Sequence, residues 1–193
     1  MTGLIILAAG SSSRLGTPKQ NLVFQGTTLL QRAITTALAA DRANVMVVLG
    51  ANAVSIEPTI ADQPIQIIHN PDWQEGMASS IRIGLAAMQL SAPQIRSIIL
   101  MLCDQPFVDV AIIDQLIKAS AQHSLVASAY NGTIGPPALF GSAHFEELLN
   151  LKGNEGAKKL LLKYADEVFK IPFPLGVIDI DTLSDHERLE DSL

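Results

Sequence analysis

The chain has 193 residues with a formal net charge of −6, and 48% of them are hydrophobic while 17% are charged. This length and composition allow a sizeable core in one domain, which we assign to residues 1–193. The acidic balance, without a run of Lys or Arg, excludes a nucleic-acid surface, and no apolar segment reaches the roughly 18 residues of a membrane span.

Short apolar runs alternate with longer segments of helical periodicity along the chain. We expect strands at residues 4–8, 45–49, 65–68, 97–102, 124–129, 168–171 and 176–180, and helices at 29–40, 77–90, 110–121, 145–149 and 157–164. This alternation of apolar strands with helices is typical of an α/β fold with a mostly parallel central sheet. Ligands of such sheets bind at the carboxyl ends of strands, so the segments after Leu7, Leu102 and Val177 should converge.

A loop rich in Gly and Ser follows the first predicted strand, with the sequence L-A-A-G-S-S-S-R-L-G-T-P-K over residues 7–19. The backbone N–H groups between Gly10 and Gly16 can approach an anion, and Arg14 and Lys19 supply positive charge. The loop fits neither G-x-x-x-x-G-K-[ST] nor G-x-G-x-x-G, so it indicates neither a P-loop NTPase nor a dinucleotide-binding fold.

Acidic residues follow or lie in two later predicted strands. Asp104 stands in Cys103-Asp104-Gln105-Pro106, where it can face a ligand or cap the helix that follows. Asp179 and Asp181 alternate onto one face of the last predicted strand, and two such carboxylates require either solvent or a cation. Mg²⁺ is typically held by one or two carboxylates together with substrate phosphates.

Two simpler features limit the alternatives. Cys103 is the only cysteine, which excludes an intramolecular disulfide and a thiolate metal cluster, and the four scattered histidines lack zinc-binding spacing. Met1 leads directly into a strand-like run without a basic region before it. We therefore expect no secretory signal peptide and a cytoplasmic location.

The loop at residues 7–19 resembles the motif L-A-A-G-x-S-x-R-[ML]-G-x-x-K of the nucleotidyltransferases, in particular their molybdenum cofactor cytidylyltransferase branch. Further motifs of this family follow in order as far as Asp185. The resemblance implies a single Rossmann-like three-layer domain of the nucleotide-diphospho-sugar transferase type. It also implies that Mg²⁺ is bound by Asp104 and by Asp179, with Asp181 as its close rival.

The resemblance assigns other residues to substrates. Residues 73–80 resemble W-x-x-G-M-x-x-S of the nucleotide pocket, so the implied nucleotide-binding residues are Leu7, Ala8, Ala9, Gly10, Ser11, Ser12, Arg14, Lys19, Gly76, Ser79, Ser80 and Asp104. The implied catalytic residues are Arg14, Lys19 and Asp104. The acceptor side is implied to include Gly135 and Pro137 of a G-x-P segment, and Gly156 and Lys158 of a segment similar to G-D-x-G-A-R. There Asn154 replaces Asp and Lys158 replaces Arg, and Lys158 can equally lie on a solvated helix face.

The implied reaction transfers CMP from CTP to the phosphate of molybdenum-molybdopterin and releases pyrophosphate. Ala9 gives the cytidylyltransferase form L-A-A-G, whereas the guanylyltransferase branch has L-A-G-G. A molybdenum hydroxylase is the expected recipient of the product. Three alternatives stay open: GTP as donor, another small acceptor such as a sugar phosphate, and a noncatalytic chaperone that hands the cofactor to such a hydroxylase.

Overall fold

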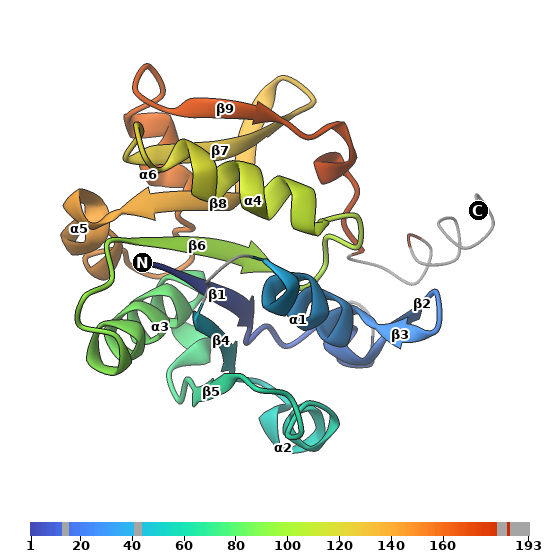
Figure 1. Ribbon diagram of the computed structural model, residues 1–193. Coiled ribbons are helices and arrows are strands. Elements are labelled where there is room, and N and C mark those ends of the chain that lie inside the picture. Colours follow the sequence, from blue (N-terminus) through green and yellow to red (C-terminus); the bar gives the residue numbers. More distant parts are fainter. Residues whose placement is uncertain (13–15, 41–43, 181–184, 186–193) are drawn as a thin grey trace.

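A seven-stranded sheet forms the centre of the computed structural model, which describes residues 1–12, 16–40, 44–180 and 185 (Figure 1). The sheet strands are β1 (Thr2–Ala8), β4 (Asn44–Leu49), β5 (Gln66–His69), β6 (Ser97–Leu102), β7 (Leu125–Tyr130), β8 (Thr133–Gly141) and β9 (Phe169–Pro172). Their order across the sheet is β5-β4-β1-β6-β8-β7-β9. A separate small hairpin joins β2 (Val23–Phe24) to β3 (Thr27–Thr28).

The strand pairings confirm a mostly parallel sheet. β1 pairs in parallel with both β4 and β6, β4 with β5, and β7 with β9. β8 is antiparallel to its neighbours β6 and β7. Because β1 and β6 are parallel and place Leu7 opposite Leu102, the loops that leave these two strands start side by side.

Helices cover both faces of the sheet, which confirms the three-layer architecture (Figure 1). α1 (Leu29–Ala39), α2 (Ala53–Ile56) and α4 (Val110–Ala119) share one core cluster, whereas α3 (Met77–Ser91), α5 (Phe145–Leu149) and α6 (Lys158–Lys163) share the other. Residues of β1 alternate between the clusters, with Leu4 and Ile6 in the first and Ile5 and Leu7 in the second. A fully apolar strand is therefore required at this position.

Local signals explain where several helices begin. At the start of α1, Thr28 and Gln31 form a reciprocal capping box, which satisfies two backbone N–H groups. At α4, the Asp109 side chain accepts a hydrogen bond from the backbone N–H of Ile112 at 2.9 Å. Asp104 therefore does not cap this helix, so that alternative is wrong. Its carboxylate can bind another group.

Two predictions of secondary structure are corrected. The strand predicted at residues 176–180 is instead the 3-10 helix η5 (Pro174–Val177), followed by irregular chain to Ile180. Pro174 fixes the backbone at the start of this turn and has no N–H for a ladder. The segment around Gly135 was expected only as an acceptor loop, yet it belongs to β8, where its prolines lie at a register shift opposite Ala127 and Ser128.

The sequence also did not predict the β2–β3 hairpin or the short helix α2. No helix within the described ranges is both long enough and apolar enough to span a bilayer.

Candidate active site

Three chain segments meet at the carboxyl ends of β1 and β6. Lys19, in the 3-10 helix η1 (Lys19–Asn21) after the first loop, forms an ion pair with the Asp104 carboxylate through its Nζ. The backbone N–H of Ile180 donates a hydrogen bond of 3.0 Å to the Asp104 carbonyl oxygen. The predicted convergence of these segments is therefore confirmed.

A buried glutamine, Gln20, holds the loop after β1. Its side chain is fully buried, and its Nε2 donates to the carbonyl oxygens of Ala8 at 2.7 Å and Gly10 at 3.1 Å. Its Oε1 accepts from the Ser12 hydroxyl at 3.4 Å, while Ser12 Oγ accepts from the Lys19 backbone N–H at 2.9 Å. Ser12 itself has a positive φ of 54°. The described residues 8–12 of the loop are thus held by a residue that the sequence analysis missed, and a polar side chain next to Lys19 was its only signal.

Asp104 carries an unsatisfied oxygen at the same place. The residue is 8% exposed, and while Lys19 binds Oδ2, Oδ1 is buried with no hydrogen-bond partner among the described residues. A buried carboxylate oxygen without a partner is costly, and a cation would remove that cost. The donor set therefore fits a divalent cation bound through Asp104.

Asp179 lies in the same neighbourhood. It immediately precedes Ile180, whose N–H is bonded to the Asp104 carbonyl oxygen, and its carboxylate is exposed. Burial raises the pKa of the Tyr130 phenol, and the negative charges of Asp179 and Asp104 raise it further. A hydrogen bond with Gln105 opposes this rise, and the contributions of both carboxylates place them near the same hydroxyl group.

The described residues contain no group of three His, Cys, Asp or Glu side chains able to hold a metal ion. Two carboxylates suit Mg²⁺, which keeps several waters and binds substrate phosphates. Asp181 and Arg14 lie outside the described residues, so the choice between Asp179 and Asp181 and the role of Arg14 stay predictions.

A cavity of about 440 Å³ opens beside Asp104 and Lys19. It joins three of the predicted motifs, and its lining consists of Leu7, Ala9, Gly10, Ser11, Lys19, Trp73, Gln74, Gly76, Met77, Leu102, Asp104 and Asn154. The wall thus combines backbone of the first loop, one ammonium group, one carboxylate and an indole ring. Such a lining suits a ligand with a flat base and an anionic phosphate chain.

Gly76 is required by the close approach of the loop around Gly153. Its φ is 122°, and a Cβ at this position would lie 2.5 Å from the Gly153 carbonyl oxygen. That oxygen also accepts a hydrogen bond of 3.1 Å from the Ala78 N–H. Gly76 lines the cavity, and glycine is required at this position because the start of α3 lies close to the 153–154 loop.

An ion pair between Arg82 and Glu75 stabilises the part of the cavity wall around Gly76 and Asn154. Arg82 binds Glu75 through both terminal nitrogens and also donates to the Leu151 carbonyl oxygen at 2.7 Å. The Arg82 hydrogen bond, and after it the N–H of Gly153, lower the pKa of Glu75 to about 2. The segment 151–154 is therefore held against the start of α3 at any pH near neutrality.

Ser79 and Ser80 face inward, away from the cavity. Both are buried, and Asn70 Nδ2 donates to their hydroxyl oxygens at 2.8 and 2.9 Å. The Ser79 hydroxyl in turn donates to the Gly76 carbonyl oxygen at 2.8 Å. Neither serine is in the cavity lining, so their placement gives them a role in fixing the turn and does not support the expected nucleotide contact.

The G-x-P segment, which the resemblance assigned to the acceptor side, lies on β8 against Tyr130. A Cβ at Gly135 would lie 2.2 Å from the Tyr130 hydroxyl oxygen, so a larger residue here would displace the phenol. The Pro136–Pro137 peptide is cis, and the Pro137 carbonyl oxygen accepts from Ser128 Oγ at 2.8 Å. Since Tyr130 is also influenced by Asp104 and Asp179, this segment is connected to the carboxylate site.

Gly156 and Lys158 lie beside an apolar slot of about 200 Å³. Gly156 approaches the sulfur of Met77, to which a Cβ at this position would come within 3.1 Å, and Lys158 is exposed at the start of α6. We use the name apolar slot for the space lined by Leu7, Met77, Ile81, Leu100, Leu102, Pro136, Ala138, Phe140, Ala157, Lys158 and Leu161.

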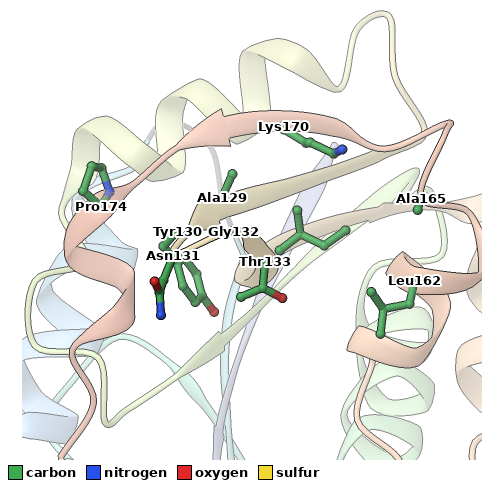
Figure 2. A pocket seen from close by; sticks show the side chains of 10 residues that line it. Ala129, Tyr130, Asn131, Gly132, Thr133, Leu162, Ala165, Lys170 and Pro174 are labelled. Carbon is green, nitrogen blue, oxygen red and sulfur yellow. The ribbon is translucent and has the colours of Figure 1, made fainter.

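A separate hollow of about 530 Å³ lies between the β7–β8 hairpin, α6, β9 and η5 (Figure 2). Figure 2 shows Tyr130 and Asn131 on the hairpin side and Leu162 on the side of α6. Lys170 is the one charged residue of its described lining, and the lining contains none of the site residues predicted from the motifs. The hollow is therefore distinct from the predicted site.

Comparisons with known proteins agree with this geometry. The model of the MobA-like NTP transferase domain matches residues 4–168. Nicotine blue oxidoreductase of Paenarthrobacter nicotinovorans is 34% identical over 136 residues, which are 70% of this chain and 65% of that protein. The match thus spans slightly less than two thirds of that relative. Molybdenum cofactor cytidylyltransferase of Escherichia coli (strain K12) is 27% identical over 182 residues, 94% of this chain and 91% of that protein.

The fold is also similar to solved structures. The manganese complex of Rv0371c from Mycobacterium tuberculosis H37Rv superimposes with a TM-score of 0.84 at 28% identity, covering 100% of this chain and 99% of that one. The family model covers most of the chain and includes Lys19 and Asp104, which lie together at the carboxyl edge of the sheet. The chain is therefore a nucleotidyltransferase and belongs to the MobA-like NTP transferase domain family.

Proposed function

We propose that this protein transfers CMP from CTP to the phosphate of molybdenum-molybdopterin, with Mg²⁺ as the metal and pyrophosphate as the second product. The observation that carries the proposal is Asp104, which is buried beside the cavity with one oxygen on Lys19 and the other without a partner among the described residues. The likeness to the Escherichia coli cytidylyltransferase supports the choice of substrates, and the manganese complex of Rv0371c supports a divalent metal.

The reaction requires positioning and charge neutralisation from the protein. An oxygen of the acceptor phosphate attacks the α-phosphorus of CTP, and the bond from that phosphorus to the pyrophosphate oxygen breaks. Lys19 and Arg14 hold the triphosphate, since a fixed cation lowers the cost of charge on the leaving group. Asp104 and Asp179 would hold Mg²⁺, which when bound offsets the charge of the phosphates.

No protein nucleophile takes part in this scheme. The one cysteine near the site, Cys103, is buried, and its burial raises the pKa of its thiol to about 12. A thiol that stays protonated at neutral pH is a poor nucleophile. The acceptor phosphate is already anionic near neutral pH, so its alignment with CTP is the main task of the site.

Donor choice rests on the loop after β1. Gln20 fixes the carbonyl groups of Ala8 and Gly10, and the Ala9 carbonyl oxygen accepts from the Ala51 N–H at 3.0 Å. Ala9 also lines the cavity. A rigid backbone of this kind can read the edge of a base, and the L-A-A-G form of the motif favours cytosine.

The decisive experiment combines the purified protein with CTP or GTP, MgCl₂ and molybdenum-molybdopterin, and follows both pyrophosphate and the dinucleotide product. We expect both products with CTP. Asp104→Asn should lower kcat by about 100-fold or more, because it removes the charge opposite the phosphates while keeping the shape of the side chain. Asp109→Asn makes the same change of charge, keeps the helix cap and should leave the rate unchanged.

Two results would contradict the proposal. If nucleotide binds but no pyrophosphate appears with either donor, the protein is a binding protein of the chaperone type. If pyrophosphate appears only with sugar phosphates, the acceptor is wrong although the transfer reaction stands.

A further inference from the structure

Gln105 is a buried residue next to Asp104 to which the sequence motifs assigned no role. It is 8% exposed, and its side-chain Nε2 donates hydrogen bonds to the carbonyl oxygens of Gly176 at 3.0 Å and Pro136 at 3.2 Å. Gly176 lies in η5, 71 residues further along the chain, and Pro136 lies in β8. One amide group therefore joins the chain after β6 to two segments that are remote in the sequence.

The bond to Gly176 holds one end of the short segment that carries Asp179. The other end is held by Asp104, whose carbonyl oxygen accepts from the Ile180 N–H at 3.0 Å. Asp179 thus lies between two anchor points, and both anchors come from the consecutive residues Asp104 and Gln105. Because Asp104 also carries the first carboxylate of the site, these two hydrogen bonds help to set where the Asp179 backbone lies relative to that carboxylate.

The anchor at Gly176 requires an amide. Its two partners are backbone carbonyl oxygens, which only accept hydrogen bonds, so the nitrogen of the side chain must face them. Gly176 is buried against the Tyr130 ring, which a Cβ at position 176 would approach within 2.6 Å. Water therefore does not readily replace the Gln105 donor.

The oxygen of the same amide has no such support. Gln105 Oε1 is buried and has no hydrogen-bond partner among the described residues. A buried polar atom without a partner costs free energy, so this side chain is not the best choice for stability alone. A departure of this kind is expected at a functional site, where the donor of the amide offsets the cost of its oxygen.

We propose that Gln105 is a positioning residue of the candidate active site: by holding Gly176 it keeps Asp179 beside Asp104, so that both carboxylates bind one divalent cation. This inference rests on the proposed function, which takes Asp104 and Asp179 as the carboxylates of the metal site. Residues that hold metal ligands in place typically contribute about 10–100-fold to metal affinity.

The test measures metal binding without turnover. MnCl₂ is titrated into the protein in the absence of nucleotide, and free Mn²⁺ is followed by electron paramagnetic resonance. Gln105→Met keeps the length of the side chain and removes both donors, so we expect the dissociation constant of Mn²⁺ to rise about tenfold or more. Asp179→Asn should also raise it, because it removes the carboxylate that Gln105 positions.

Turnover at high metal concentration gives a second readout. Both carboxylates are still present in Gln105→Met, so saturating Mn²⁺ should restore its kcat for CTP to within about twofold of the wild-type value. Saturating Mn²⁺ should not restore Asp104→Asn, which has lost a ligand. A general loss of stability does not produce this separation between metal affinity and kcat.

The matched control removes a buried hydrogen bond at the other end of β6. Ser97 Oγ lies 2.8 Å from Thr2 Oγ1, and both side chains are buried. Ser97→Ala should lower the Tm and leave the dissociation constant of Mn²⁺ unchanged. If Gln105→Met does not fold, Gln105→Asn replaces it, because a side chain shorter by one methylene draws the amide away from both carbonyl oxygens.

The outcomes separate this inference from the proposed function. Wild-type Mn²⁺ affinity in the Gln105 variant or in Asp179→Asn, or an equal weakening in Ser97→Ala, would overturn the role of Gln105 while the transfer reaction stands. Absence of Mn²⁺ binding to the wild-type protein would overturn both. Weaker Mn²⁺ binding in the Gln105 variant and in Asp179→Asn, together with no pyrophosphate release from CTP by the wild-type protein, would support the role of Gln105 and refute the transfer reaction.

Discussion

Replacement of Gln20 by Leu is the sharpest test of how the first loop is held. The substitution keeps an apolar stem of similar size but removes the Nε2 donor from the carbonyl oxygens of Ala8 and Gly10, and the Oε1 acceptor from Ser12. Because Gln20 is fully buried, water cannot replace these bonds without a rearrangement of the loop. The loop backbone that lines the cavity should therefore lose its fixed conformation.

The magnitude follows from the lost contacts. Each hydrogen bond contributes about 1 kcal/mol net, and a buried carbonyl oxygen left without a donor costs about 1–3 kcal/mol. We expect Gln20→Leu to lower the free energy of unfolding by about 2–4 kcal/mol. For a chain of this size, that corresponds to a decrease in Tm of about 4–16 °C.

Thermal denaturation followed by circular dichroism measures the stability, and initial rates with CTP measure the consequence for the site. We expect the KM for CTP to rise about tenfold, since the loop must be ordered again on binding. Gln122→Leu is the control, because Gln122 is exposed and lies far from the loop in the sequence. An unchanged Tm together with an unchanged KM in Gln20→Leu would refute the assignment of Gln20 as the support of the loop.

Two further predictions concern the acceptor side and the buried thiol. Gly135→Ala forces the Tyr130 hydroxyl to move, so we expect at least a tenfold loss of kcat/KM for the acceptor while the dissociation constant of CTP stays unchanged; normal acceptor kinetics would contradict the contact. Burial raises the pKa of Cys103 to about 12, so the folded protein should not react with 5,5′-dithiobis(2-nitrobenzoic acid) at pH 8, whereas the urea-unfolded protein should react with one equivalent; rapid labelling of the folded state would refute the burial. A raised thiol pKa also means that this group stabilises the fold below pH 9 relative to more alkaline pH, where only the unfolded thiol ionises.

The sequence alone determined the alternation of elements and the edge of the sheet that carries the site. Apolar runs at strand length and apolar faces at helical spacing are local properties, so β6 was placed with its observed bounds and α3 within one residue at its end. Asp104 was expected at a carboxyl edge for the same reason, because an acid and a proline directly follow a buried strand. The motif resemblance added the family, which the comparisons confirm.

Only the tertiary structure decided which polar groups meet. Gln20 finds its partners up to 12 residues away, and Lys19 meets Asp104 across 85 residues. The same holds for Ser79 and Ser80, whose hydroxyls turn inward because Asn70 supplies a buried amide. The residues next to a polar side chain in the sequence do not indicate which remote groups will form hydrogen bonds with it.

Residues 174–180 show that the sequence pattern is also an incomplete guide to backbone conformation. The alternation around Asp179 has the period of a strand, yet Pro174 starts a 3-10 turn. The segment after this turn is held in part by the hydrogen bond from Ile180 to Asp104 and by the packing of Ile180 with Phe24 and Leu29. The spacing of apolar residues and the composition therefore determined the fold class and the edge of the sheet at which the candidate site lies. The partners that hold each side chain were decided by the three-dimensional packing, because hydrogen bonds and burial depend on distances between segments that are remote in sequence.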